Sequence, residues 1–345
     1  MKDEILYIQH EGKVVEAGSV FEHVMAITLD PRTDNREGIL RCITSREGDI
    51  AMKGTIDRSE LHEVTGESLE HFDIGEKLDI KNESEIIAQI YTPGLKFIGL
   101  EDPDIWIDTE KDLMHLYFTL PVVNTINENK STTHLGHAVG KDLNSLAMTA
   151  PALLANEHYG AKELSVAPVN TKGFRYNLVE SSDKVGDTVY SVVRVVLSED
   201  MGTPWEFGEI AFHPHTSGLA WIAGHASPGP LLSKNFIDVG EGKLLGIMNG
   251  CEANQIIDGK TKYGDFLTGL FIYDYEQGKI DWVSETPLIR DSEAGKDGRR
   301  AITFASQFVE TEQGKGILYA HVDDSFVRAY TLDATQLMKL LPKSI

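Results

Sequence analysis

Short runs of apolar residues separated by polar turns recur along almost the whole chain. The first run, Val20–Leu29, ends at a turn over residues 30–35, and a second apolar run, Gly38–Thr44, follows. This order is typical of two paired β-strands. Similar pairs are predicted at 105–119, 175–197, 207–223, 243–250, 267–283 and 301–330.

Helical periodicity is scarce. Two segments carry it, residues 143–155 and the C-terminal Ala334–Leu341, for which Asp333 is the expected N-cap. Many short strands with regular turns and few helices are typical of an all-β sandwich, barrel or propeller.

A weak internal repeat favours the propeller. Ala138–Leu143 and Val196–Met201 each end an apolar strand with a small residue, an acid and an apolar residue. Their separation is near the length of one propeller blade, roughly 40–60 residues. Because no linker rich in Pro, Gly or Ser divides the chain, residues 1–345 are expected to form one domain with a short C-terminal helix.

The charge balance limits the classes of partner. The chain has 345 residues, 54 of them acidic and 32 basic, which gives a formal net charge of -22. Nucleic acids and anionic membranes attract positive charge, so neither is expected as a partner, whereas a neutral sugar is compatible.

Cys42 and Cys251 are too few for a disulfide framework. Without a signal-like or membrane-length apolar run, a cytoplasmic location is expected.

The stretch Gly99–Asp104 gathers three carboxylates around a proline. Pro103 biases Asp102 toward extended geometry, which places Glu101 and Asp102 at the entrance of the strand that follows. A β-scaffold can display catalytic carboxylates at such a strand mouth. A solvated turn is the alternative.

Several motifs, in order along the chain, resemble those of glycoside hydrolase family 130, the five-bladed propellers that comprise mannoside phosphorylases and β-mannosidases. Gly99–Pro103 resembles the family's Gly-x-Glu-Asp-Pro-Arg motif, and Lys162–Pro168 resembles its Lys-Asn/Asp-Ala-x-Leu-Phe-Pro segment. Further similar segments are Ile39–Arg41, 227–232 with 242–250, and Tyr319–Asp323. The resemblance implies a five-bladed β-propeller acting on β-mannosides or related oligosaccharides, without a cofactor.

The resemblance also implies roles for individual residues. Asp102 matches the family's proton donor, which is thought to act through a sugar hydroxyl. Arg41 and Asp323 match substrate-contacting positions, and an ion pair of Arg41 with Asp102 would lower the pKa of Asp102, against a simple acid role. The other expected substrate ligands are Glu101, Lys162, Asn249 and Tyr263. For Glu101, a structural role at the strand ends is equally open.

Departures from the family pattern indicate water rather than phosphate as the acceptor. Asn249 replaces a histidine of the phosphorylases, Asp104 replaces an arginine, and Glu180 stands at a cationic position. Each lost cation removes a charge-assisted phosphate contact, and each added carboxylate repels the dianion. Glu180 or Glu252 is therefore expected to activate water opposite Asp102 in an inverting hydrolysis, with simple pairing to a nearby cation as the alternative.

Other functions stay open at this stage: a mannoside phosphorylase, a catalytically silent propeller that binds glycans or another protein, or another five-bladed family with three carboxylates around its funnel. Homo-oligomerisation is open as well.

The pairs His134/His137 and His213/His215 lack accompanying Cys or carboxylate ligands, so no metal site is expected. The residues predicted to converge at one end of the central funnel are Arg41, Asp102, Lys162, Glu180, Asn249 and Asp323.

Overall fold

The computed structural model describes residues 6–91, 93–126, 131–156, 159–202, 204–298 and 300–343. Its strands form antiparallel sheets, and each four-stranded unit is called a blade below. Blade 1 contains β2 (His23–Leu29), β3 (Glu37–Glu47), β4 (Ile56–Ser68) and β5 (His71–Lys77). Blade 2 contains β7 (Glu101–Asp108), β8 (Leu113–Asn124), β9 (Thr132–Gly140) and β10 (Ala147–Met148), with β6 (Leu95–Phe97) beside the far end of β8.

The remaining strands build three more blades. Blade 3 contains β11 (Lys162–Ser165), β12 (Arg175–Val185), β13 (Thr188–Ser198) and β14 (Glu206–Phe212). Blade 4 contains β15 (His225–Leu231), β16 (Lys243–Cys251), β19 (Phe266–Asp274) and β20 (Lys279–Val283). Blade 5 contains β21 (Thr303–Glu312), β22 (Lys315–Val322), β23 (Phe326–Asp333) and the N-terminal β1 (Tyr7–Gln9).

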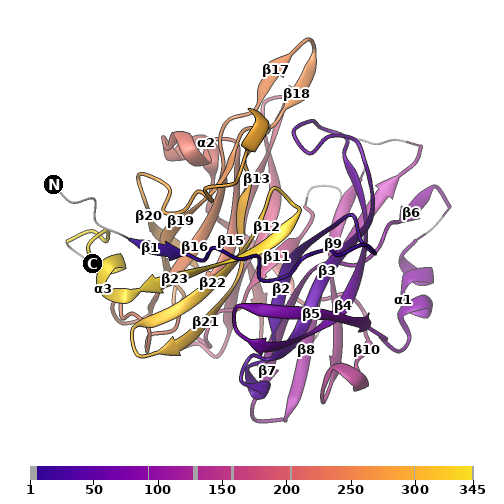
Figure 1. Cartoon of the computed structure of the whole chain (residues 1–345), viewed down its shortest axis with the longest axis horizontal. Coiled ribbons are helices and arrows are strands. Elements are labelled where there is room, and N and C mark those ends of the chain that lie inside the picture. Colours follow the sequence, from indigo (N-terminus) through magenta and orange to yellow (C-terminus); the bar gives the residue numbers. More distant parts are fainter. Residues whose placement is uncertain are drawn as a thin grey trace.

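The first strand of each blade lines a closed ring. β2 contacts β7, β7 contacts β11, β11 contacts β15, β15 contacts β21, and β21 returns to β2. The two ends of the chain complete the last blade, because β1 pairs antiparallel with β23, with Tyr7 opposite Leu332 (Figure 1). The fold is the all-β, five-bladed propeller that the sequence predicts.

Apolar side chains on both faces of the central strands hold the blades together. Every residue of β19 is buried, and in β16 every residue after Lys243 is buried. One apolar cluster joins blades 1 and 5 through Val24, Ile27 and Tyr319. A fully buried side chain of this kind stabilises the fold by roughly 1.5–3 kcal/mol. This packing fixes the starts of the inner strands relative to one another.

The helices differ in part from the prediction. In the described residues the α-helices are α1 (Glu83–Ile90), α2 (Pro214–Ser217) and α3 (Ala334–Met338). Asp333 caps α3 as predicted, accepting hydrogen bonds from the amides of Thr335 and Gln336. The helix predicted at 143–155 is wrong, because a 3-10 turn leads directly into β10, which pairs with β9. The strand pair predicted at 207–223 is a single strand, β14, followed by α2.

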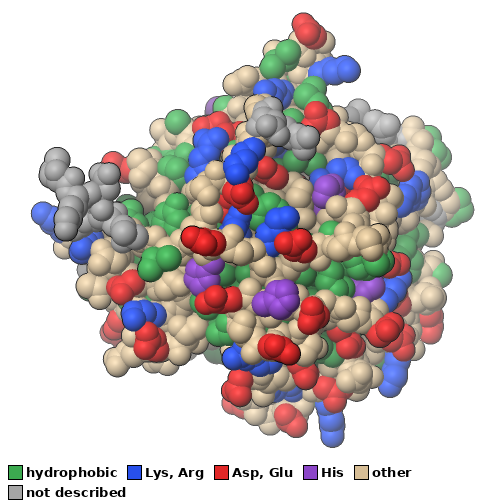
Figure 2. All heavy atoms as spheres, in the orientation of Figure 1, with side chains coloured by type: hydrophobic (Ala, Val, Ile, Leu, Met, Phe, Trp, Pro, Cys, Tyr) green, Lys and Arg blue, Asp and Glu red, His purple; other side chains and the backbone are tan. Residues whose placement is uncertain are grey.

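A hairpin of β17 (Gln255–Ile257) and β18 (Lys260–Lys262) projects from blade 4 between β16 and β19 (Figure 1). Acidic and basic side chains are spread over the face shown in Figure 2 rather than gathered in one patch. Among the described residues, no helix has the length and apolar character needed to cross a membrane.

Candidate active site

Three consecutive inner strands begin with ionisable side chains. Asp102 is the second residue of β7, Lys162 is the first residue of β11, and His225 is the first residue of β15. Because neighbouring inner strands are in contact, these strand starts lie together at one end of the ring. Carboxylates and cations from several blades therefore meet there.

Arg41, from β3, holds the two acidic residues at the start of β7. Its Nη1 lies 2.8 Å from Asp102 Oδ1, and its Nη2 lies 2.8 Å from Glu101 Oε1. Its Nε donates a hydrogen bond to Ser59 Oγ at 2.9 Å. The guanidinium is buried, so removing it would leave two enclosed carboxyl groups without a counter-charge. The sequence-based objection that Arg41 pairs with Asp102 is confirmed.

The backbone of Asp102 differs from the prediction. Asp102 has a left-handed conformation, with φ 47°, at a bulge between Glu101 and Asp104. The extended geometry expected from Pro103 is therefore wrong. The ion pair with Arg41 and the tight contact upstream fix this conformation: a Cβ on Gly99 would lie 1.9 Å from Ser59 O. Residues in such unfavourable backbone conformations persist only where the surrounding structure holds them in place, and they cluster at functional sites.

The shared guanidinium does not give the two carboxyl groups the same protonation. Burial opposes the ionisation of Asp102, but Arg41 and Lys162 outweigh it and hold the pKa of Asp102 below its ordinary value. At Glu101 burial prevails over Arg41 and raises the pKa to about 7. Near neutral pH, Asp102 is therefore a carboxylate, and it needs a source of protons to act as a donor.

A second charged group joins blades 3 and 4. Glu180 in β12 places Oε1 3.4 Å from Lys162 Nζ and Oε2 2.8 Å from His225 Nε2. Burial opposes its ionisation, but His225 and Lys162 lower the pKa of Glu180 to about 2. Glu180 is thus a weak base that lies between Lys162 and His225. This is the pairing that the sequence left open as the alternative.

Glu163 is a site residue that the sequence reasoning missed. It follows Lys162 at a bulge in β11, with φ 53°. Burial, together with the negative charge of Asp102, raises the pKa of Glu163 well above its ordinary value. A signal was available, because Glu163 stands where the resembling motif has Asn or Asp.

His321 and Asp324, at the end of β22 and in the turn after it, also belong to this region and were missed. His321 Nε2 lies 3.2 Å from Asp324 Oδ1, and the charge of His321 acts on Asp102 as well. Burial opposes ionisation of Asp324, but His321 and Arg46 lower its pKa to about 2. Spacing along a strand gives no hint that a side chain of blade 5 acts electrostatically on one of blade 2.

Two predicted substrate ligands are engaged elsewhere. Asp323 accepts hydrogen bonds from the amides of Ile302 at 2.8 Å and Gly295 at 3.0 Å, so its carboxylate holds the segment before β21. Asn249 accepts a hydrogen bond from Ala305 N at 2.8 Å and donates one to Ala305 O at 3.0 Å, so its amide joins β16 to β21. Of the six residues predicted to converge, the structure brings together Arg41, Asp102, Lys162 and Glu180.

The other predicted residues lie at the edge of the site. The guanidinium of Arg300 lies 5.0 Å from the ring centroid of Tyr263, and the charge of Lys162 also reaches Tyr263. Burial raises the pKa of Asp104 to about 7. Glu252 directly follows β16 and is exposed, so the structure does not join it to the buried carboxyl groups.

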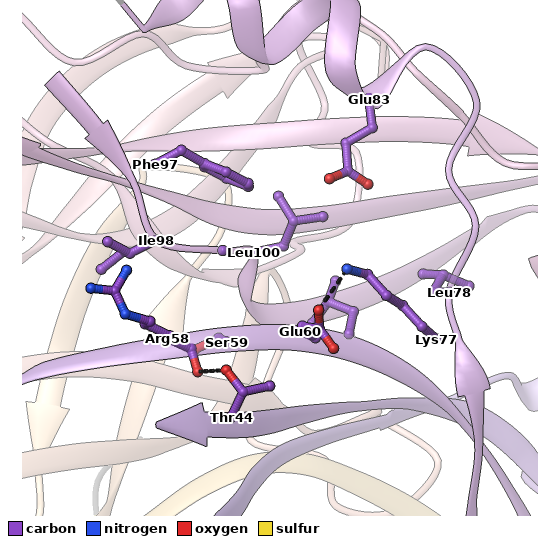
Figure 3. Close-up of a pocket in the computed structure, with 12 residues that line it drawn as sticks. Thr44, Arg58, Ser59, Glu60, Lys77, Leu78, Glu83, Phe97, Ile98 and Leu100 are labelled. Carbon is purple, nitrogen blue, oxygen red and sulfur yellow. Dashed lines mark hydrogen bonds and ion pairs between the residues drawn. The ribbon is translucent and has the colours of Figure 1, made fainter. Parts of the chain in front are cut away.

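A cavity of about 220 Å³ lies beside the segment that leads into Glu101. It is lined by Ser59, which binds Arg41, and by Gly99 and Leu100. Figure 3 shows Lys77 beside Glu60 at its lining, and the two form an ion pair at 2.7 Å. This cavity flanks the site without including Asp102.

The histidine pairs are held within the blades. His137 Nδ1 lies 2.6 Å from Thr149 Oγ1 and its Nε2 lies 2.9 Å from His115 Nδ1, while His213 Nε2 lies 3.3 Å from Asp183 Oδ2. In the part of the chain that the structure describes, no group of three or more His, Cys, Asp or Glu side chains is placed to hold a metal ion.

Comparisons with known proteins identify the fold. No protein-family model and no curated protein matches the sequence. A β-1,2-mannobiose phosphorylase from Listeria innocua superposes with a TM-score of 0.66 at 13% identity, covering 98% of this chain and 99% of that one. A glycosyl hydrolase from Bacteroides ovatus gives 0.64 at 16% identity, covering 95% and 94%.

A mannose phosphorylase from Leishmania mexicana, in complex with a phosphate ion, gives a TM-score of 0.51 at 14% identity, covering 94% of this chain and 89% of that one. At these identities the likeness concerns the fold. It agrees with the fold implied by the motifs from Ile39–Arg41 to Tyr319–Asp323.

Proposed function

We propose that the chain is a carbohydrate-active enzyme that hydrolyses β-mannosides or related glycosides with inversion, with Asp102 as the proton donor and water as the acceptor. We also propose that residues 1–345 form one domain. The observation that carries the proposal is the meeting of Asp102 and Glu180 with Arg41 and Lys162 at one end of the propeller ring. Solved structures of this fold include a glycosyl hydrolase and mannoside phosphorylases.

The charge balance of the site supports water over phosphate. Arg41 is neutralised by Glu101 and Asp102, and Lys162 is paired with Glu180. A phosphate dianion would have to displace these carboxylates or bind beside them, and like charges repel strongly where the dielectric constant is low. A neutral sugar and water meet no such barrier.

For the base, the structure supports Glu180 over Glu252, because Glu252 is exposed. Because the pKa of Glu180 is low, Glu180 is suited to orient His225 rather than to accept a proton itself. Its Oε2 lies 2.8 Å from His225 Nε2. With Nε2 facing Glu180, His225 Nδ1 is the atom that we propose accepts the proton from water, as in other carboxylate–histidine pairs.

Phosphorolysis is the second candidate. Lys162, His225 and His321 all stand near the start of the inner strands, and a solved structure of the same fold holds a phosphate ion. A catalytically silent glycan-binding propeller is the third.

The test is a panel of mannosides and related glycosides, incubated with and without phosphate, with free sugar and sugar-1-phosphate followed separately. We expect free sugar, at a rate that phosphate leaves unchanged. Sugar-1-phosphate formed at a rate rising with phosphate would establish phosphorolysis instead. If no glycoside is cleaved while binding persists, the propeller is a silent binder.

The proton donor is tested by Asp102→Asn. Loss of a positioned general acid lowers the rate by about 100- to 10,000-fold, and Asn tolerates the left-handed backbone of this position. The matched control is Asp112→Asn, because Asp112 is exposed and has φ 54° in the turn after β7. An Asp102→Asn enzyme that keeps most of the wild-type kcat would remove Asp102 from this role.

A further inference from the structure

We propose that the cavity between blades 1 and 2 is a second carbohydrate site, which holds one neutral sugar unit beside the segment that leads into Glu101. This inference rests on the proposed function, because it gives a carbohydrate-active enzyme a further contact with sugar. Asp102 does not line the cavity, so the site is separate from the one proposed for bond cleavage.

The lining of the cavity combines two blades and a helix. Blade 1 contributes residues 58–61, the start of α1 contributes Glu83, and residues 97–100 lead from β6 toward β7. Figure 3 shows the Glu83 side chain directed from the helix toward the cavity. The volume of about 220 Å³ lies below the roughly 300–1,000 Å³ of pockets for drug-sized ligands. A single sugar ring is therefore the size of ligand that suits it.

The ionisable side chains of the lining balance one another. Arg58 and Lys77 are cations, and Glu60 and Glu83 are carboxylic acids. Such a lining favours neither an anion nor a cation. Hydroxyl groups, in contrast, can donate to carboxylate oxygens and accept from ammonium or guanidinium N–H groups. A neutral ligand with several hydroxyl groups can therefore use both kinds of side chain.

Glu83 is the acceptor that lacks a donor. Among the described residues, none forms a hydrogen bond or an ion pair with its carboxylate, and Lys77 is bound to Glu60 at 2.7 Å instead. Glu83 is half-buried, and burial raises its pKa. A carboxylate taken partly out of water without a donor is costly. A sugar hydroxyl in the cavity would supply that donor.

The two cations are available to a ligand. Arg58 Nη2 lies 3.1 Å from Glu47 Oε1, and the Glu47 side chain is mostly exposed. The pair of Lys77 with Glu60 is also open to solvent. Exposed ion pairs contribute little to stability, so either cation can turn toward a bound hydroxyl group at little cost to the fold.

Phe97 supplies an apolar face. Its ring packs edge-on against Tyr91, with centroids 5.4 Å apart and planes at 69°. Tyr91 is in turn held by a hydrogen bond from its hydroxyl to Pro121 O at 2.6 Å. The electron-rich face of an aromatic ring attracts C–H groups such as those of a sugar ring. The cavity thus offers the apolar and the polar contacts that a sugar needs.

One wall of the cavity is shared with the candidate active site. Ser59 N donates a hydrogen bond to Ile98 O at 3.0 Å, and Ser59 Oγ accepts one from Arg41 Nε at 2.9 Å. Ser59 also forms a β-bridge with Gly99. A sugar in the cavity would rest against this wall, so its binding should steady the segment before Glu101.

The first test is hydrogen–deuterium exchange with D-mannose, D-glucose and D-galactose, which needs no catalysis. At least one sugar should slow amide exchange in residues 58–61 and 97–100. Glu83→Ala should weaken the apparent affinity for this protection by about 10-fold or more, because it removes a hydrogen bond to a charged group. The matched control is Glu85→Ala, an exposed glutamate in the same first turn of α1 that does not line the cavity.

A second variant guards against an indirect effect of Glu83→Ala on the helix. Phe97→Leu removes the aromatic face, keeps an apolar side chain, and should also weaken the protection. If no sugar protects these residues in the wild type, or if Glu83→Ala and Phe97→Leu bind sugar as well as Glu85→Ala does, the cavity is not a sugar site.

Kinetics distinguish a free sugar from the end of a longer chain, which present the same hydroxyl groups. If the unit belongs to a substrate whose other end reaches Asp102, Glu83→Ala should raise KM for longer oligosaccharides and leave KM for an aryl mannoside unchanged. If the ligand is a free sugar, both KM values should stay unchanged while the loss of protection remains. Inactivity of the wild type on every glycoside would reject the proposed function and leave the exchange result standing.

Discussion

Arg41 is the side chain on which the protonation of the site depends. It is 6% exposed and binds Glu101, Asp102 and Ser59 at once. Replacing Arg41 with Met should leave two buried carboxyl groups without their cation, and we expect the free energy of unfolding to fall by about 3–5 kcal/mol. Urea titration measures this. Since protonating the two carboxyl groups removes the conflict, the loss should shrink at acidic pH, and an equal loss at every pH would contradict the role given to Arg41.

Glu180 gives the fold a dependence on pH with a definite sign. Its pKa is lowered from an ordinary value of 4.5 to about 2. A group with a depressed folded-state pKa stabilises the fold above its unfolded pKa, and that stability is lost as the pH falls through the folded value. The shift corresponds to roughly 3 kcal/mol. Between about pH 5 and pH 2, Glu180→Gln should therefore lose less stability than the wild type in urea titrations, and parallel losses would contradict the ion pairs with His225 and Lys162.

Side-chain amides act as links between neighbouring blades. Asn249 binds both the N–H and the C=O of Ala305, and Gln307 does the same for Leu29, at 2.7 Å and 3.1 Å. Each link joins an inner strand to the next blade and satisfies buried backbone groups.

Asn249→Ala and Gln307→Ala should each lower the free energy of unfolding by about 2–4 kcal/mol, because each leaves a backbone donor and acceptor unpaired. Thermal or urea unfolding measures the loss, and KM should change little in both variants. A rise in KM confined to Asn249→Ala, with stability intact, would restore the substrate-binding role expected from the sequence.

The elements of the fold could be predicted further than the site. Strand pairs such as 20–44 follow from short apolar runs separated by turn residues, and motif order indicated the propeller. The pair Arg41–Asp102 was foreseen because both positions matched one motif set. Glu163 was missed because it follows Lys162 at a bulge, and His225 because its partner Glu180 lies in another blade. Neither a register shift nor a contact between blades leaves a periodic signal in the sequence.

At the scale of the whole molecule, the ring depends on the pairing of the two ends of the described chain. β1 is three residues long, yet it covers the edge of β23, with Tyr7, Ile8 and Gln9 opposite Leu332, Thr331 and Tyr330. The side chains add to this closure: Gln9 Nε2 donates to Ser292 Oγ at 2.7 Å, and His10 Nε2 lies 2.8 Å from Thr331 Oγ1. Without β1, the backbone groups of β23 would form an open sheet edge.

Deleting residues 1–10 should therefore lower the melting temperature and promote self-association through β23. The melting temperature should fall by about 2–4 °C for each 1 kcal/mol lost, as for a domain of 150–250 residues, and by less in a larger one. Calorimetry and size-exclusion chromatography measure the two effects. The control is Ile8→Ala, which shortens an exposed side chain of β1 and keeps its backbone pairs with Thr331. If the deletion variant melts like the wild type and stays monodisperse to the same degree, blade 5 is closed by its other three strands alone.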